Sequence, residues 1–263
     1  MSSEGWLYAV FGHPIRHSLS PAIHNRAFSE TGQGLQYISV DCAPHELSAK
    51  LEALRRLGGR GANVTRPLKE TALALAAGTL DDWTTAAGAA NTLVWQESGW
   101  YAANTDCEAL YRRLKSTSSA MRSALVLGAG GAARASAAVL QRLNYHVAAA
   151  ARNPAACDFA DERLSWSERV APRDWAVVVN ATPLGQTGEA QEAEWPIPAA
   201  GGVAVDWVYR PNRTQFLEAA QAHGIATVDG LSLLVEQAAL AWLVWFGYEG
   251  PREAMNEAVR EWR

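Results

Sequence analysis

A glycine-rich turn between a strand and a helix constrains this chain more than any other feature. The letters GAGGAA occupy residues 128–133, after a strand-like run at 123–127 and before a helical run at 132–143. In this context Gly128 permits a tight turn, Gly130 lets the backbone approach a pyrophosphate, and Ala133 allows close packing of helix on strand. The helix N-terminus offers unpaired N–H groups to the anion. The turn therefore predicts a dinucleotide-binding fold, with a plain tight turn as the alternative.

The end of the next strand, predicted at 146–151, indicates which dinucleotide is bound. Proteins that bind NAD place an acidic residue there for the ribose hydroxyl, whereas this chain has Arg152 and no acid. An arginine can pair with a 2′-phosphate, so NADP is favoured; the alternative is a solvated residue at a strand end. The sequence NATPLG at 180–185 ends another strand at the same edge of the sheet. It either lines the cofactor or forms an ordinary loop.

The pattern of strands and helices predicts an α/β protein with two domains. Strands at 6–11, 37–41 and 61–65 alternate with helices at 21–30, 45–57 and 68–77, which favours parallel pairing. A second alternation has further strands at 175–180, 203–208 and 225–228 and a helix at 214–223, typical of a doubly wound sheet. We expect a substrate domain at 1–106, completed by the helices of 231–263, a Rossmann-type domain at 107–230, and a cleft between the two.

Composition excludes several classes of function. The 263 residues are 49% hydrophobic and 19% charged, with a net charge of −4 and no long basic run, so a nucleic-acid surface is not expected. Three widely spaced cysteines indicate a reducing compartment, and no signal peptide is evident, which together predict a cytoplasmic setting. The apolar segment 231–246 contains Glu236 and Gln237 and predicts a buried helix, not a membrane span.

Polar side chains gather in two parts of the first half. Ser18 and Ser20 could both face a carboxylate or a polyol, although Ser20 before Pro21 is equally suited to capping a helix. Lys69 is expected near the positive end of a helix, where its charge does not help the helix. If Lys69 met Asp106 in a cleft, the two could exchange a proton with a substrate hydroxyl. The histidines at 13, 17 and 24 match no common zinc spacing, so no metal is expected.

Eight segments in order resemble the shikimate dehydrogenase family. They read GHPIRHSLSPAIHN, NVTRPLK, GAANTL, ANTD, LGAGGAARA, NATPLG, DWVYRPNRT and DGLSLLVEQAALAW, and together they span nearly the whole chain. The resemblance implies reversible reduction of 3-dehydroshikimate to shikimate by NADPH, with Lys69 and Asp106 as the catalytic pair. It assigns the substrate to Ser18, Ser20, Thr65, Asn91, Tyr209 and Gln237. It assigns the cofactor to Gly128, Ala129, Gly130, Gly131, Ala132, Arg152, Asn180, Thr182, Asp229 and Gly230.

Several positions depart from the family pattern. Ala102, Ala109 and Ser232 stand where glycine is usual, Arg66 replaces a small apolar residue, and no second basic residue follows Arg152. Three functions are therefore weighed: a dehydrogenase of shikimate, one acting on quinate or an amino analogue, and a non-catalytic sensor of cofactor or ligand. The intact Lys69 and Asp106 favour an enzyme. We expect a small-molecule substrate, no nucleic-acid or membrane partner, and a monomer or homodimer.

Overall fold

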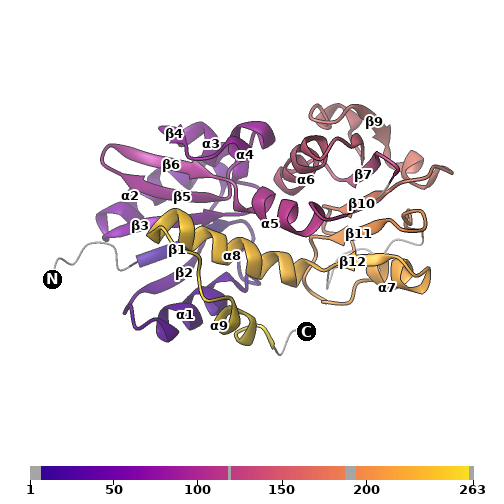
Figure 1. The fold of residues 1–263 in the computed structure, drawn as a ribbon. Helices are drawn as coiled ribbons and strands as arrows, with labels where there is room; N and C mark the ends of the chain where they lie inside the picture. Colours follow the sequence, from indigo (N-terminus) through magenta and orange to yellow (C-terminus); the bar gives the residue numbers. More distant parts are fainter. Residues whose placement is uncertain (1–6, 118–119, 187–193, 261–263) are drawn as a thin grey trace. The chain divides into compact units, whose positions relative to one another are not determined.

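The computed structural model describes residues 7–117, 120–186 and 194–260, which form two compact units (Figure 1). One unit holds the described residues through Glu108 together with those from Val235 onward, and the other holds Ala109–Leu234. The boundaries expected from the sequence fall a few residues earlier in the chain. Each unit is built on its own sheet, and the two units are described in turn.

The first unit contains a mixed sheet with the strand order β2-β1-β3-β5-β6-β4. Its strands are β1 (Leu7–Gly12), β2 (Gln36–Asp41), β3 (Gly59–Val64), β4 (Gly78–Thr79), β5 (Thr92–Gln96) and β6 (Gly99–Ala103). The first three strands pair in parallel, as the alternating pattern predicts. Strands β5 and β6 form an antiparallel hairpin that the sequence analysis did not predict. Trp6, expected to open β1, lies outside the described residues.

The helices of the first unit depart from their expected bounds at several ends. They are α1 (Ser20–Glu30), η1 (Pro44–Glu46), α2 (Leu47–Arg56), α3 (Lys69–Leu75), α4 (Asp82–Ala87), the start of α5 (Thr105–Leu114), most of α8 (Gly230–Phe246) and α9 (Arg252–Glu257). The helix expected at 68–77 begins at Lys69, because Leu68 takes the cap position. It ends at Leu75 because Ala76 is extended and leads into β4. The last helix, for which the sequence predicts residues 252–261, ends at Glu257, and residue 261 is not described.

Two apolar layers cover the first sheet. On one face, side chains of β1 and β3 pack with Leu47, Leu51 and Leu54 of α2 and with Leu68 and Ala72 at α3. The other face is aromatic. Tyr8 of β1 contacts Phe28 of α1 and Trp245 of α8, with ring centroids 5.6 and 4.9 Å apart. Figure 1 shows α1 and α9 side by side below this sheet. The C-terminal helices thus complete a core that the N-terminal strands begin.

The second unit contains a fully parallel sheet with the order β12-β11-β10-β7-β8-β9. Its strands are β7 (Ser123–Leu127), β8 (His146–Ala151), β9 (Glu162–Ser165), β10 (Val177–Asn180), β11 (Val203–Asp206) and β12 (Ala226–Val228). Its helices are the rest of α5, α6 (Gly131–Arg142), η2 (Pro154–Ala156), η3 (Trp166–Val170), α7 (Gln215–Ala222) and the start of α8. Counted from β7, this is the 3-2-1-4-5-6 order of a Rossmann fold. The predicted α/β class is confirmed; β9 was not predicted.

The expected buried helix at 231–246 is present as α8. Leu231, Leu233, Ala238, Ala241 and Trp242 are each fully buried. Over the described residues, no helix is both long and apolar enough to cross a membrane.

Candidate active site

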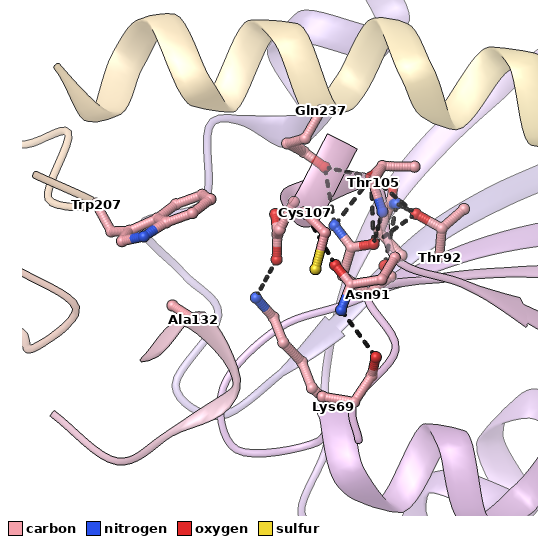
Figure 2. Close-up of polar contacts among 12 residues, drawn as sticks. Lys69, Asn91, Thr92, Thr105, Cys107, Ala132, Trp207 and Gln237 are labelled. Carbon is pink, nitrogen blue, oxygen red and sulfur yellow. Dashed lines mark hydrogen bonds and ion pairs between the residues drawn. The ribbon is translucent and has the colours of Figure 1, made fainter. Parts of the chain in front are cut away.

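The first unit brings Lys69 and Asp106 together. Lys69 opens α3, Asp106 lies in the first turn of α5, and the Lys69 Nζ donates to Asp106 Oδ2 at 2.5 Å (Figure 2). The two side chains are only 13% and 7% exposed. A carboxylate is favourable at a helix N-terminus, whereas a lysine is not, so the lysine depends on its partner for stabilisation. The pair thus places an ammonium group beside a carboxylate where little water reaches them.

Backbone contacts fix where each member of the pair stands. The Leu68 N–H donates to the Thr65 carbonyl at 2.8 Å, and the Lys69 carbonyl accepts from the Ala90 N–H at 2.9 Å. On the other side, Asn104 precedes α5 and its Oδ1 accepts from the Cys107 N–H at 3.1 Å, which caps the helix. The lysine and the aspartate are therefore held by the turns that follow β3 and β6, two strands on either side of β5.

Asn91 is the centre of a buried polar cluster in the same unit, shown in Figure 2. Its Oδ1 accepts from the Thr105 N–H at 2.8 Å and from the Thr92 hydroxyl at 3.0 Å. Its Nδ2 donates to Thr105 Oγ1 at 3.0 Å and to Gln237 Oε1 at 3.4 Å. Because a backbone N–H can only donate, the contact with Thr105 fixes which end of the carboxamide carries oxygen. Gln237, on α8, thus joins Asn91 across 146 residues of sequence.

The glycine turn of the second unit has the geometry that a pyrophosphate needs. Gly128 has φ of +112°, and a Cβ there would lie 3.0 Å from the Ala181 carbonyl oxygen, so the turn requires glycine. At Gly130, by contrast, a Cβ would meet no atom of the described chain within 4 Å. Gly130 caps α6 without any side-chain hydrogen bond. An open backbone at a helix N-terminus fits the phosphates of a dinucleotide.

The strand ends around this turn carry the other expected cofactor residues. Arg152 directly follows β8 and is exposed. Asn180 and Thr182 bond to each other, since Asn180 Oδ1 accepts from the Thr182 N–H at 3.1 Å and from its hydroxyl at 2.7 Å. Asn180 Nδ2 also donates to the buried Asp206 at 2.9 Å. Burial is the main influence on Asp206 and raises its pKa to about 7, against hydrogen bonds from Thr214, Val208 and Asn180 that lower it.

Asp229 precedes α8 and Gly230 is its first residue, both in the second unit. Asp229 Oδ1 accepts from the Ser232 N–H at 2.8 Å, and the Ser232 hydroxyl donates to the Asp229 carbonyl at 2.8 Å. A Cβ on Gly230 would lie 2.4 Å from the Val208 carbonyl oxygen, so the close approach requires glycine there. Trp207 also holds the turn after β11, because its Nε1 donates to Ser136 of α6 at 2.9 Å.

Comparison with known proteins relates the chain to one family. The family model described as "Shikimate dehydrogenase substrate binding domain" matches residues 10–93. A shikimate dehydrogenase (NADP(+)) of Xanthomonas campestris pv. campestris strain 8004 is 39% identical over 269 residues, covering 96% of this chain and 95% of its own. One from Symbiobacterium thermophilum is 37% identical over 282 residues, covering 97% of this chain and 94% of its own.

The chain belongs to the shikimate dehydrogenase family. Among solved structures, the shikimate 5-dehydrogenase of Thermus thermophilus in complex with NADP(H) and shikimate is 36% identical. It aligns with a TM-score of 0.82 over 98% of this chain and 99% of its own. The resemblance inferred from eight sequence segments is therefore confirmed at the level of family and fold.

The serine loop of this shikimate dehydrogenase family member is tied to the lysine turn. The His13 N–H donates to the Arg66 carbonyl at 3.0 Å, and the Thr65 N–H donates to the Phe11 carbonyl at 2.8 Å. Ser20 lies inside α1 and makes no side-chain cap, so the capping interpretation of Ser20 is wrong. The Ser18 Oγ instead accepts from the Ser20 N–H at 3.3 Å.

The residues that depart from the family pattern fit into the fold without unusual backbone geometry. Ala102 and Ala109 are both fully buried, in β6 and α5 respectively. Over the described residues, positive φ outside glycine occurs at Glu97 and Asn144, so neither alanine nor Ser232 forces a left-handed backbone. The side chains at the unusual positions fill space without changing the fold.

Two expectations from the sequence remain predictions, namely a substrate role for Tyr209 and the absence of a metal. Tyr209 belongs to the second unit and is half-buried, and burial raises its pKa. His24 is fully buried against aromatic rings. Within the described ranges, no group of three or more His, Cys, Asp or Glu could hold a metal ion.

Sequence reasoning missed the residues that support Asn91. Thr92, Thr105 and Asn63 all stand in the motifs quoted for the family, yet none was given a role. Their polarity inside otherwise apolar strands and at a helix start was the available signal, since buried polar groups need partners.

Proposed function

We propose that this protein is an NADP-dependent shikimate dehydrogenase, which interconverts 3-dehydroshikimate and shikimate. The observation that carries the proposal is the nearly buried ion pair of Lys69 and Asp106, joined at 2.5 Å, in a chain 39% identical to a shikimate dehydrogenase along almost its whole length. A protein that only senses a ligand has no need for a proton-transfer pair in its binding site. An enzyme is therefore the better account.

In the proposed reaction the cofactor supplies a hydride and the chain supplies a proton. NADPH, when bound, supplies the hydride that reduces the ring ketone. The carbonyl oxygen gains negative charge as its carbon is reduced, and the Lys69 ammonium donates the proton that converts this oxygen to a hydroxyl. Asp106 stabilises the charged lysine before the transfer and holds Nζ in place. In the reverse direction the neutral amine accepts the hydroxyl proton.

The substrate residues are proposed from the family resemblance and from their placement. A ring bearing hydroxyls and a carboxylate needs several donors, which Ser18, Ser20, Thr65, Asn91, Gln237 and Tyr209 would provide. Asn91 and Gln237 are already part of one hydrogen-bonded cluster. Arg152 is proposed to bind the 2′-phosphate of NADP, and the open Gly130 turn its pyrophosphate.

The wider setting is also a proposal. Three cysteines, all free and buried, support a reducing, cytoplasmic compartment. A net charge of −4 without a basic run supports the absence of a nucleic-acid partner. We propose a monomer or homodimer that needs no membrane and no metal.

The test is nicotinamide reduction followed at 340 nm with shikimate or quinate, each paired with NADP or NAD. We expect turnover with shikimate and NADP to exceed every other pairing. Faster turnover with quinate would reassign the substrate. Absence of turnover in all four pairings, with protein shown to be folded, would refute the enzyme.

Arg152→Ala tests the cofactor assignment separately. We expect the Kd for NADPH, measured by its fluorescence, to rise about tenfold or more, while the Kd for NADH stays the same, since only NADPH has the 2′-phosphate. Arg142→Ala is the matched control, because Arg142 is also exposed but ends α6 at the far end from the glycine turn. Equal loss of both cofactors in Arg152→Ala would contradict the assignment.

A further inference from the structure

A buried chain of hydrogen bonds runs from Tyr37, on edge strand β2, to the Asn91 carboxamide. The Tyr37 hydroxyl donates to Asn63 Oδ1 at 2.6 Å. Asn63 Nδ2 donates to Thr92 Oγ1 at 3.0 Å and to the Asn91 carbonyl at 3.2 Å. The Thr92 hydroxyl donates to Asn91 Oδ1 at 3.0 Å. All four side chains are at most 6% exposed, so water does not compete for these bonds.

The direction of every bond in this chain follows from the Asn91 backbone carbonyl, which can only accept and therefore takes the Nδ2 side of Asn63. Asn63 Oδ1 then faces Tyr37 and accepts from its hydroxyl, and burial raises the pKa of Tyr37 well above its usual value, so this hydroxyl keeps its proton. Asn63 must then present oxygen to Tyr37 and nitrogen to Thr92. Because the Thr92 oxygen accepts from that nitrogen, its own proton is directed to Asn91 Oδ1. Without the Tyr37 hydroxyl, Asn63 Oδ1 loses its donor, and the side chain that directs the Thr92 proton is held only through its Nδ2.

Tyr37 is held more firmly than packing alone requires. The Asn25 side chain donates to the Tyr37 carbonyl at 2.9 Å and accepts from its N–H at 2.8 Å. The His24 ring stacks on the Tyr37 ring, with centroids 4.3 Å apart and planes 17° from parallel. His24 Nδ1 accepts from the Trp242 Nε1 at 3.1 Å. Burial lowers the pKa of His24 to about 3, so this ring stays neutral.

The same helix meets both ends of the chain of bonds. Trp242 and Gln237 both lie on α8; Trp242 contacts His24, and Gln237 accepts from Asn91 Nδ2. A rotation of α8 about its axis would therefore alter the surroundings of both Tyr37 and Asn91. None of these contacts is needed to join the strands of the sheet, which already pair through their backbones.

We propose that Tyr37 is a positioning residue whose hydroxyl, acting through the buried hydrogen bonds of Asn63 and Thr92, holds the Asn91 carboxamide in the place from which it binds a polyol substrate. The inference rests on the proposed function, because Asn91 is a substrate residue only if that function holds. It predicts that Tyr37 affects the binding of shikimate without touching it, and leaves the binding of NADPH unchanged.

The experiment measures the Kd of shikimate by calorimetry, which needs no cofactor, together with KM and kcat. In Tyr37→Phe we expect the Kd and KM of shikimate to rise about tenfold, the ratio that corresponds to about 1.4 kcal/mol. The Kd for NADPH should stay within about twofold of the wild type. Tyr145→Phe is the matched control: Tyr145 is buried in the second unit, and its hydroxyl contacts no hydrogen-bond partner among the described residues.

Thr92 supplies the second arm, independent of whether Tyr37→Phe folds. Thr92→Val keeps the shape of the side chain and removes the hydroxyl, so it should weaken shikimate binding as Tyr37→Phe does. Thr92→Ser keeps the hydroxyl, so it should bind shikimate as the wild type does. If the two residues act along one path, the double variant Tyr37→Phe/Thr92→Val binds shikimate no more weakly than Thr92→Val alone.

Each result has one meaning. An unchanged Kd in Tyr37→Phe and Thr92→Val, with the wild type active on shikimate, would overturn this inference alone. Strictly additive effects in the double variant would also overturn it, because they show separate structural roles. A wild type that neither binds nor oxidises shikimate would overturn the proposed function, and this inference with it.

Discussion

Replacing Lys69 by methionine separates the catalytic role of the ion pair from its role in stability. Methionine keeps the aliphatic stem of lysine and removes the ammonium. The proton donor is lost, so we expect kcat to fall by about 10²- to 10⁴-fold. Asp106, only 7% exposed, is left without its partner. Leaving a buried charge unpaired costs about 3–5 kcal/mol.

The structure places the expected loss of stability at the lower end of that range. Lys69 retains 13% exposure, so some water reaches the site and we expect about 3 kcal/mol. For a chain of this size, each kcal/mol lowers the melting temperature by about 2–4 °C, which gives a fall of about 6–12 °C. Calorimetry or denaturation followed by circular dichroism measures it.

The double variant Lys69→Met/Asp106→Leu decides between the two roles. Replacing a buried ion pair by apolar side chains is often neutral or stabilising, so we expect its melting temperature to return to that of the wild type or above. Its activity should stay as low as that of Lys69→Met. Recovery of activity along with stability would refute the reasoning, because the pair would then serve only the fold.

Two further predictions concern the second unit. The pKa of Asp206, about 7 in the native state against an ordinary 3.8, means that the native state holds more protons between about pH 4 and 7. The free energy of unfolding should therefore fall as pH rises through that window, by about 4 kcal/mol in all, and this dependence should vanish in Asp206→Asn. Urea unfolding of both proteins at the two ends of the window measures it. An equal pH dependence in the variant would contradict the prediction. Gly128→Ala, at φ of +112°, should lose about 1–3 kcal/mol of stability. Gly130→Ala, where a Cβ meets nothing, should keep its stability yet bind NADPH more weakly, and unchanged binding would contradict a pyrophosphate at that turn.

The sequence predicted those parts of the fold whose signals are local and long enough. The glycine turn, the parallel strands around it and the apolar helix α8 each have a pattern that one window of sequence contains. The hairpin of β5 and β6 was not predicted, because the polar motifs at the ends of its strands indicate a functional site and carry no signal for strand pairing. Strand β4 has two residues and depends wholly on pairing with β6.

The candidate site shows the same division. Lys69 and Asp106 could be named from their motifs, but their meeting depends on two turns 37 residues apart. The role of Tyr37 could not be foreseen, because a tyrosine in an edge strand has the same sequence signal whether its hydroxyl points to water or to Asn63. The register of β2, β1 and β3 places Tyr37 level with Gly61, two residues before Asn63, so both side chains lie on one face of the sheet and meet.

The division of α8 between the two units has a consequence for the order in which the protein matures on the ribosome. The second unit is continuous, Ala109–Leu234, so all of its strands have been synthesised before the chain ends. The first unit starts earlier but finishes last, since Trp242 and Trp245 cover the aromatic face of its sheet. Until these residues emerge, α8 does not cover Tyr8, Phe28 and Tyr37, and the nascent chain exposes apolar surface of the kind that chaperones recognise. Shortening the chain before Trp242 should therefore harm the first-made unit more than the unit next to the cut.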